Sequence, residues 1–219
     1  MKKRIGFEYR KGIAGEEVPF ATFLNYSDEK EKSSGILGKI LSRLLVREKM
    51  TLFDIGSGSG EYLRLALNKV RDLKEVFATL LEPSQDLARK LRSARKLFPR
   101  TVSVDIVGDT FENFTTATLF DIILVSHVPL AKDNITRLPE IYLRMLKFLK
   151  PDGHLVIVLR GKDDIHQFRT RFKTIIMGRD YYSLTIDDAE AVFQKIAEQL
   201  PLRIEKFSVK AKLHLPYPD

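Results

Sequence analysis

The sequence predicts an α/β domain with a doubly wound, mostly parallel sheet and helices on both faces. From residue 50 onward, apolar strand-like runs alternate with amphipathic helical stretches, which is typical of a parallel sheet connected by helices. In addition, the apolar run Thr51–Ile55 leads into a glycine-rich turn, GSGSG, and a helical pattern follows. A strand, a glycine turn and a helix in this order place a ligand-binding loop at the carboxyl end of a parallel strand.

The alternation predicts six strands and four helices after residue 50. Strands are expected at Thr51–Ile55, Glu75–Leu81, Val102–Val107, Asp121–Ser126, His154–Leu159 and Ile204–Leu213. Helices are expected at Glu61–Val70, Ser84–Phe98, Arg137–Leu149 and Ile186–Leu200. Thr185 and Asp188 have the spacing of a capping box at the start of the last helix. A seventh strand is apparently absent, so we expect either a shortened chain or a sheet with a free edge beside the fifth strand.

The first 49 residues differ from the rest of the chain, and we expect them to form a helical segment of their own. The stretches VPFATFLNYSDEKEK and GILGKILSRLLVRE predict two helices separated near Ser33–Gly35. Such a segment either packs against the sheet or folds over the ligand crevice as a lid. The predicted organisation is therefore a lid over residues 1–49 and a ligand-binding domain over residues 50–219.

Composition limits the classes of protein and site. The chain has 219 residues, enough for one domain with a full core, and no apolar run long enough for a membrane span. There is no apolar stretch of a secretory signal, so we expect a cytoplasmic protein that does not bind membranes. The absence of cysteine excludes disulfides and thiolate metal sites, and we expect no metal. The formal net charge of +8 leaves RNA open as a partner, although the densest basic stretch, Ala88–Arg100, is typical of a solvated helix face.

The glycine turn excludes two common phosphate-binding loops. In the dinucleotide fingerprint G-x-G-x-x-G the third glycine would fall at Glu61, whose negative charge opposes a pyrophosphate. A Walker loop is absent because no Gly-Lys-Ser/Thr follows. The pattern that fits is D-x-G-x-G-x-G, from Asp54 through Gly60. Glycines allow positive φ and a close approach of the backbone, and the helix that follows offers free N–H groups to a carboxylate or a phosphate.

Two further acids follow predicted strands. Glu82 ends the second strand in TLLEPS, where a carboxylate can accept hydrogen bonds from both hydroxyls of a ribose. Asp109 follows the third strand in VGDTFENF, where an acceptor could bind an adenine amino group. Because the carboxyl ends of parallel strands meet at one edge, we expect these acids beside the glycine loop. For Asp109 alone, an ordinary turn acid is an equally good interpretation.

Together these residues resemble the class I S-adenosylmethionine-dependent methyltransferases, which have a Rossmann-like sheet. LFDIGSGSGEY, LLEPS, VGDTFENF, FDIILVSHVPL and LKPDGHLVIVL look like five successive motifs of that family, over roughly Phe53 to Leu213. The resemblance implies S-adenosyl-L-methionine as cofactor and S-adenosyl-L-homocysteine as product. It implies that the glycine loop passes close to the methionine moiety, that Asp54 orients the amino acid end, that Glu82 binds the ribose, and that Asp109 and Thr110 bind the adenine. The implied cofactor-binding residues are Asp54, Gly56, Ser57, Gly58, Gly60, Glu82, Pro83, Asp109, Thr110 and Ser126.

A narrower resemblance is to the histamine N-methyltransferase group. FLNYSDEKEK, IGSGSGEYLRLALNKV, LEPSQ and YYSLTIDDAEAVFQKI look like stretches of that group. It implies that Glu29 binds a substrate ammonium, that Ser126 lies beside the cofactor, and that His127 lies beside the acceptor, where the group has a glutamine. The group's pocket tyrosines correspond here to Leu130 and Ala131, and its long C-terminal segment has no counterpart. The predicted catalytic residues are therefore Glu29 and His127.

These resemblances predict a methyltransferase acting on a small-molecule substrate, with an amine nitrogen as the expected acceptor. Transfer from a sulfonium depends mainly on holding the acceptor aligned at short distance, and His127 or Glu29 could take its proton. Two alternatives stay open. The basic surface favours an RNA or protein methyltransferase, whereas the departures at the acceptor site favour a non-catalytic partner protein that binds the cofactor. The oligomeric state does not follow from the sequence.

Overall fold

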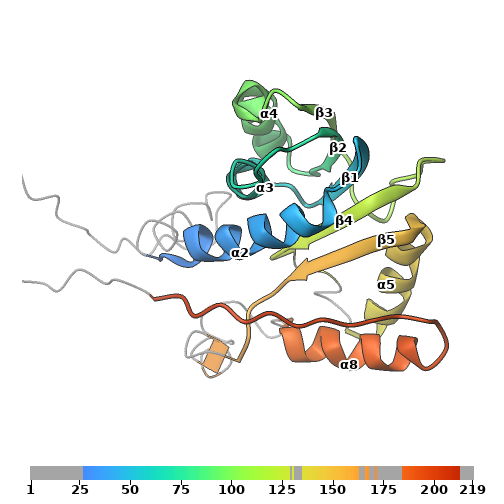
Figure 1. Cartoon of the computed structure of the whole chain (residues 1–219). Helices are drawn as coiled ribbons and strands as arrows, with labels where there is room; N and C mark the ends of the chain where they lie inside the picture. Colours follow the sequence, from blue (N-terminus) through green and yellow to red (C-terminus); the bar gives the residue numbers. More distant parts are fainter. Residues whose placement is uncertain are drawn as a thin grey trace, which may run out of the picture.

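The computed structural model describes residues 27–128, 130, 135–162, 166–167, 171 and 184–212. A helix, α2 (Glu29–Leu44), precedes a sheet formed by β1 (Lys49–Ile55), β2 (Glu75–Leu81), β3 (Val102–Val107), β4 (Phe120–Ser126) and β5 (Leu149–Val158). The connecting helices are α3 (Glu61–Leu67), α4 (Gln85–Ala94), α5 (Leu138–Lys147) and α8 (Ile186–Ala197), with short 3₁₀ turns at Arg95–Leu97 and Ile135–Arg137. Figure 1 shows these elements along the chain.

The five strands form one sheet in the order β3-β2-β1-β4-β5, and every pair is parallel. This confirms the predicted doubly wound sheet, with five of the six predicted strands in it. The main boundary difference is β5, which begins five residues earlier than predicted and takes in Pro151-Asp152-Gly153. An irregularity in its pairing opposite Phe120 and Ile122 accommodates that stretch.

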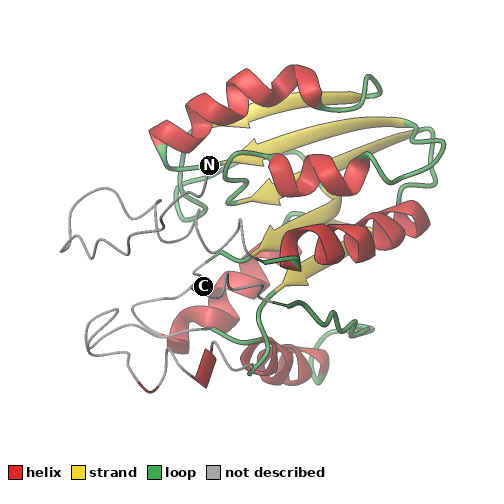
Figure 2. Cartoon of the chain, turned by 90° about the vertical axis from the view of Figure 1, so that its left-hand side faces the viewer, coloured by secondary structure: helices red, strands yellow, loops and turns green. Residues whose placement is uncertain are grey.

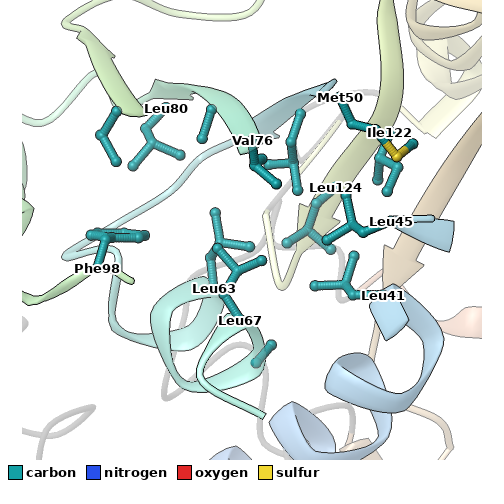
Figure 3. Close-up of a cluster of buried hydrophobic side chains, with 14 of the residues drawn as sticks. Leu41, Leu45, Met50, Leu63, Leu67, Val76, Leu80, Phe98, Ile122 and Leu124 are labelled. Atoms are coloured by element: carbon teal, nitrogen blue, oxygen red, sulfur yellow. The ribbon is translucent and has the colours of Figure 1, made fainter. Parts of the chain in front are cut away.

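Helices cover both faces of the sheet, and each face has its own core. On one face, α2, α3 and α4 pack on side chains of β1, β2 and β4, and Figure 3 shows this cluster around Leu63, Leu80 and Leu124. On the other face, α5 and α8 pack on Phe53, Ile123 and neighbouring residues. Figure 2 shows the strands running between the two sets of helices. The rigid sheet therefore fixes the positions of the loops at its carboxyl edge.

The predicted break near Ser33–Gly35 is wrong, because α2 runs through it without interruption. The Ser33 hydroxyl donates to the carbonyl of Glu29 (2.5 Å) and the Ser34 hydroxyl to the carbonyl of Glu31 (3.0 Å), so neither serine competes for the helix backbone. Leu37 and Leu41 are buried in the core. Most of α2 is thus a core helix, and only its first turn reaches the ligand edge; the part of the predicted lid before residue 27 lies outside the described residues.

The predicted sixth strand is also wrong over residues 204–212. These residues form no strand, and the ladders of the described sheet end at β5. Ile204, Phe207 and Val209 are exposed, although their spacing is partly that of a half-buried strand. The segment returns toward α2, where the Asp28 N–H donates to the Lys212 carbonyl at 3.2 Å and the Lys212 N–H donates to the Asp28 carboxylate at 2.6 Å. An alternating pattern predicts a strand, but a strand also needs a hydrogen-bonding neighbour.

Candidate functional site at the carboxyl edge of the sheet

The register of the sheet brings the predicted site residues to one edge. Ile55, the last residue of β1, pairs with Leu81 on one side and Val125 on the other. The residues that follow these three positions, the glycine loop, Glu82 and Ser126, therefore lie at the same level of the sheet. Since Leu81 also pairs with Val107 of β3, the turn containing Asp109 begins at this level too.

The three loop glycines serve different purposes. All three adopt a left-handed conformation, with φ of 70° at Gly56, 58° at Gly58 and 73° at Gly60. A Cβ at Gly56 would collide with Val128, and one at Gly60 would collide with Leu91, whereas Gly58 faces open space. Internal packing thus accounts for Gly56 and Gly60. Gly58 is the position where the bare backbone leaves room for a ligand.

The loop N–H groups are held by the protein itself. Gly56 and Ser57 donate to the carbonyl of Leu81, and Gly58 donates to Glu82 Oε2 at 2.8 Å. The other oxygen, Glu82 Oε1, accepts from the N–H of Ser84 at 2.8 Å. Glu82 is only 5% exposed, so its carboxylate joins the glycine loop to the start of α4. Each oxygen keeps a second lone pair, so the ribose contact expected of Glu82 stays a prediction.

Asp54 lies beneath the glycine loop as a buried acid, only 4% exposed. Burial raises the pKa of its carboxyl group to about 7; the Ser57 hydroxyl opposes this rise and the charge of Glu82 adds to it. The group therefore changes its protonation near neutral pH. A positively charged ligand atom beside it would favour the ionised form, which fits the predicted role of Asp54 toward an amino group.

Asp109 is engaged in its own turn. Its Oδ1 accepts from the N–H of Thr110 at 2.7 Å and from the side-chain amide of Asn113 at 3.2 Å. This is the behaviour of a turn acid, the alternative left open above. Pro83 lies exposed beside Glu82. The adenine contacts of Asp109 and Thr110 and the cofactor contact of Pro83 stay predictions.

The two predicted catalytic residues lie together, although they are 98 positions apart in the sequence. Glu29 Oε1, from the first turn of α2, lies 3.4 Å from His127 Nε2 at the end of β4. Glu29 Oε2 accepts from the guanidinium of Arg160 at 3.0 Å. Sequence reasoning missed Arg160. Applying the strand-end rule to the fifth strand would have found it, because Arg160 directly follows the apolar run LVIVL.

His127 is held in an unusual conformation. Its φ is 53°, a left-handed value that residues other than glycine rarely adopt, and its N–H donates to the carbonyl of Val158 at 2.9 Å. Burial lowers the pKa of its imidazole; the negative charge of Glu29 opposes this shift and the positive charge of Arg160 adds to it. A histidine with a lowered pKa is neutral at pH 7 and can accept a proton.

Tyr62 is a second residue that the sequence reasoning missed. Its ring lies edge-on to the His127 ring, with centroids 6.4 Å apart. Its hydroxyl is buried and makes no hydrogen bond to the residues that the structure describes. Burial is the main cause of its raised pKa, so the phenol stays neutral. Ser33 and Ser126 are the neutral polar neighbours of this hydroxyl.

Other parts of the described chain offer less to a ligand. Hollows on the exposed side of α4 (around Arg89 and Ser93) and beside α2 (around Lys32 and Lys69) are lined by none of the predicted site residues. No group of three His, Cys, Asp or Glu residues within the described ranges is arranged to hold a metal ion. Over the same ranges, no helix is both long enough and apolar enough to cross a membrane.

Solved structures share this fold at low sequence identity. The plantazolicin methyltransferase BpumL, solved in complex with a triazolic desmethylPZN analog and SAH, is 17% identical, with a TM-score of 0.58 over 84% of this chain and 70% of that one. The cyclopropane synthase MmaA2 from Mycobacterium tuberculosis is 20% identical, with a TM-score of 0.53 over 85% and 63% of the two chains. The mycolic acid cyclopropane synthase CmaA1, complexed with SAH and CTAB, is 17% identical, with a TM-score of 0.57 over 76% and 60%.

At these identities the similarity establishes the fold alone, a Rossmann-like parallel sheet flanked by helices. The narrower similarity to the histamine N-methyltransferase group is not confirmed by these neighbours. No protein-family model matches the chain, and no curated protein matches its sequence.

Proposed function

We propose that the chain is an S-adenosyl-L-methionine-dependent methyltransferase. The observation that supports this most directly is the convergence of Asp54, Gly58 and Glu82 at one edge of the sheet, with the Glu82 carboxylate 2.8 Å from the Gly58 N–H. Glu61 disfavours a pyrophosphate at this loop. Two of the structural neighbours, BpumL and CmaA1, were solved with SAH, which is consistent with the same cofactor here.

The residues present fit this cofactor. The bare backbone of Gly58 faces open space, and the buried carboxyl of Asp54, with its pKa near 7, is suited to an ammonium group. Glu82 has lone pairs left for ribose hydroxyls, and Asp109 with Thr110 lies at the next strand end. The cofactor supplies an activated methyl group on a sulfonium. The protein binds the acceptor in line with that methyl group and excludes water.

For the acceptor we propose a small molecule that presents an amine nitrogen or a hydroxyl. His127 and Glu29 lie at the end of β4 and the start of α2, on the same edge as the glycine loop, and His127 is neutral at pH 7. An acceptor held there could lose its proton to a side chain as it is methylated. The structural neighbours include enzymes whose names refer to plantazolicin and mycolic acid, so the neighbours do not narrow the acceptor class.

The cofactor proposal is tested by calorimetry with S-adenosylhomocysteine. We expect the wild type to bind, and Glu82→Gln to bind at least about tenfold more weakly, since the amide NH2 group places a donor against one of the two backbone N–H groups that the carboxylate accepts from. Asp105→Asn, a change at an exposed position of β3, is the matched control and should bind as the wild type does. Undetectable binding by folded wild type, or unchanged affinity in Glu82→Gln, would overturn the proposal.

A second candidate is an RNA methyltransferase, favoured by the exposed basic side chains along α4, its 3₁₀ extension and the turn that follows: Arg89, Lys90, Arg92, Arg95, Lys96 and Arg100. Phosphate contacts predict an RNA affinity that falls steeply as salt rises. Fluorescence anisotropy with a labelled RNA at several salt concentrations measures this slope. Weak binding that does not depend on salt would exclude this second candidate.

A further inference from the structure

We propose that Arg160, Glu29 and His127 form a linked set, in which Arg160 holds the Glu29 carboxylate, Glu29 accepts the Nε2–H of His127, and Nδ1 of His127 takes the acceptor's proton. Glu29 then orients the histidine and does not bind a substrate ammonium, and Arg160 is a positioning residue. The catalytic part of this inference rests on the proposed methyltransferase function, whereas the arrangement of the three side chains stands on the structure alone.

The three side chains come from separate elements that converge. Glu29 is in the first turn of α2, His127 follows β4 and Arg160 follows β5. Both Glu29 oxygens are engaged, with Oε1 at 3.4 Å from His127 Nε2 and Oε2 at 3.0 Å from the Arg160 guanidinium. A guanidinium stays protonated at all ordinary pH values. Arg160 therefore already balances the negative charge of Glu29, which a substrate ammonium would need for its own ion pair.

Arg160 is well placed to position Glu29. Its side chain is only 14% exposed, so the ion pair is shielded from solvent more than an ordinary surface pair. Its backbone is held as well, because its carbonyl accepts the Ile186 N–H at the start of α8 (3.0 Å). The guanidinium therefore approaches Glu29 from a backbone position that the sheet and α8 hold in place.

The Nε2 nitrogen of the His127 ring lies 3.4 Å from Glu29 Oε1, which is an ion-pair distance. The N–H of His127 is bonded to Val158, the φ of 53° sets the direction of the side chain, and the edge of the Tyr62 ring lies against the imidazole. Such backbone strain persists only where the surroundings impose it. Nδ1 has no hydrogen-bond partner among the described residues, and the side chain is 36% exposed. With Nε2–H directed at Glu29, Nδ1 carries the lone pair.

The charges around the ring keep it neutral before the reaction. Glu29 faces it from α2 and Arg160 from the end of β5, so their charges offset each other, and Tyr62 of α3 is an uncharged phenol. Burial lowers the pKa of the imidazole below its ordinary value. A neutral imidazole can take a proton on Nδ1, and the imidazolium so formed is stabilised by the Glu29 carboxylate at Nε2.

The step balances as follows. The bond between the sulfonium sulfur and the methyl carbon breaks, and its electron pair stays on sulfur. The acceptor nitrogen or oxygen forms the new bond to the methyl carbon, and the proton that it loses moves to His127 Nδ1. The protein releases that proton to water before the next turnover. No oxidant or other co-reactant is required.

Nuclear magnetic resonance of the histidine side chains tests the arrangement without cofactor or acceptor. In ¹⁵N-labelled protein, with the His127 signals assigned by their loss in His127→Gln, we expect the Nε2–H tautomer. Glu29→Gln should lower the pKa of His127 by roughly one unit and Arg160→Gln should raise it, in line with the charges removed. Lys30→Gln, a neighbouring change on α2, should leave it unchanged.

Arg160→Lys separates charge from geometry. It keeps the positive charge but loses the planar fork, so the pKa of His127 should stay near the wild-type value while the tautomer preference weakens. A wild-type Nδ1–H tautomer, or no change in the pKa of His127 in Glu29→Gln, overturns the arrangement. If Arg160→Gln does not fold, Glu29→Gln and Arg160→Lys decide the question. Calorimetry with S-adenosylhomocysteine reports separately on the proposed function, so the two failures are distinguishable.

Discussion

The Asp54 carboxyl group has a strongly raised pKa, and this shift makes the unfolding free energy depend on pH in a definite direction. Its pKa is 3.8 in an unperturbed chain and about 7 in the folded protein, so the folded state binds the proton more tightly. Its contribution to stability is complete below pH 4 and is lost as the pH rises toward and through 7. Over that range the loss amounts to at most about 4 kcal/mol.

We therefore predict that Asp54→Asn removes this part of the pH dependence. The difference in unfolding free energy between variant and wild type should shift in favour of the variant as the pH rises from 4 to 8. Urea unfolding at several pH values measures it, and Asp105→Asn at the exposed position on β3 is the control. A difference that is constant across this range would show that Asp54 is ionised throughout.

The same group predicts how cofactor binding depends on pH. If Asp54 binds an ammonium group as a carboxylate, it must lose its proton first, so affinity should fall by up to about tenfold per pH unit below 7. Calorimetry with S-adenosylhomocysteine at pH 5.5, 6.5 and 7.5 tests this. Affinity that does not vary, while wild type remains folded, would remove Asp54 from the amino-group site.

Gly60 and Gly58 allow a matched comparison of packing and backbone strain. Both have positive φ, so alanine costs roughly 1–2 kcal/mol at either position. At Gly60 the added methyl group would also meet Leu91 and Phe98, which adds roughly 1–3 kcal/mol. We predict that Gly60→Ala unfolds at clearly lower denaturant than Gly58→Ala. Equal midpoints in urea would contradict the packing argument.

The helix α8 begins with a complete capping box, and that start matters for the site. The Thr185 hydroxyl accepts from the Asp188 N–H, and the Asp188 carboxylate accepts from the Thr185 N–H at 2.9 Å. The next residue, Ile186, donates to the Arg160 carbonyl, so the cap holds α8 against the end of β5.

We predict that Thr185→Ala lowers the unfolding free energy by about 1 kcal/mol, the usual cost of losing such a cap. The matched control is Thr101→Ala at an exposed turn position before β3, which should change stability little. Chemical denaturation followed by circular dichroism measures both. Equal stabilities of the two variants would mean that the cap does not hold α8 in solution.

The helix α2 shows how tertiary packing overrides local preference. Two serines and a glycine at positions 33–35 are poor helix formers, and they predicted a break. In the folded chain both serines are buried and bond back to helix carbonyls. Gly38 lets the helix approach the Ala66 carbonyl on α3 at a distance that leaves no room for a Cβ. Burial of Leu37 and Leu41 then favours one continuous helix.

Within the described residues the sheet has two edge strands, β3 and β5. β1 is paired on both sides, whereas β5 is paired only with β4 within the described residues. We predict that amide hydrogens of β1 exchange far more slowly than the outward-facing amides of β5 and those of residues 204–212. Hydrogen exchange followed by mass spectrometry measures this. Protection of β5 equal to that of β1 would show that another strand covers the edge in solution.

Sequence reasoning located most of the fold because its signals are local. Periodicity placed β2 and β3 at their observed bounds, and the glycine turn after β1 placed the loop at the carboxyl edge. The strand-end rule located Glu82 for the same reason, since parallel strands bring their ends to one edge, whereas His127 came from the resemblance to the histamine N-methyltransferase group. The rule was not applied to the fifth strand, whose end would have given Arg160, and Tyr62 was overlooked because a single aromatic residue on a helix has no spacing pattern that distinguishes it from a core residue.

Taken alone, the sequence determined the parallel sheet, its glycine loop and the acids at the strand ends, because periodicity, turn residues and strand order are properties of neighbouring positions. Only the tertiary structure decided that Glu29 pairs with Arg160 and His127, that the space at Gly60 is filled by Leu91, and that residues 204–212 form no strand. Those outcomes depend on contacts between side chains that are far apart in the chain. Such contacts form, and contribute free energy, only after the folded sheet has brought the ends of its strands together.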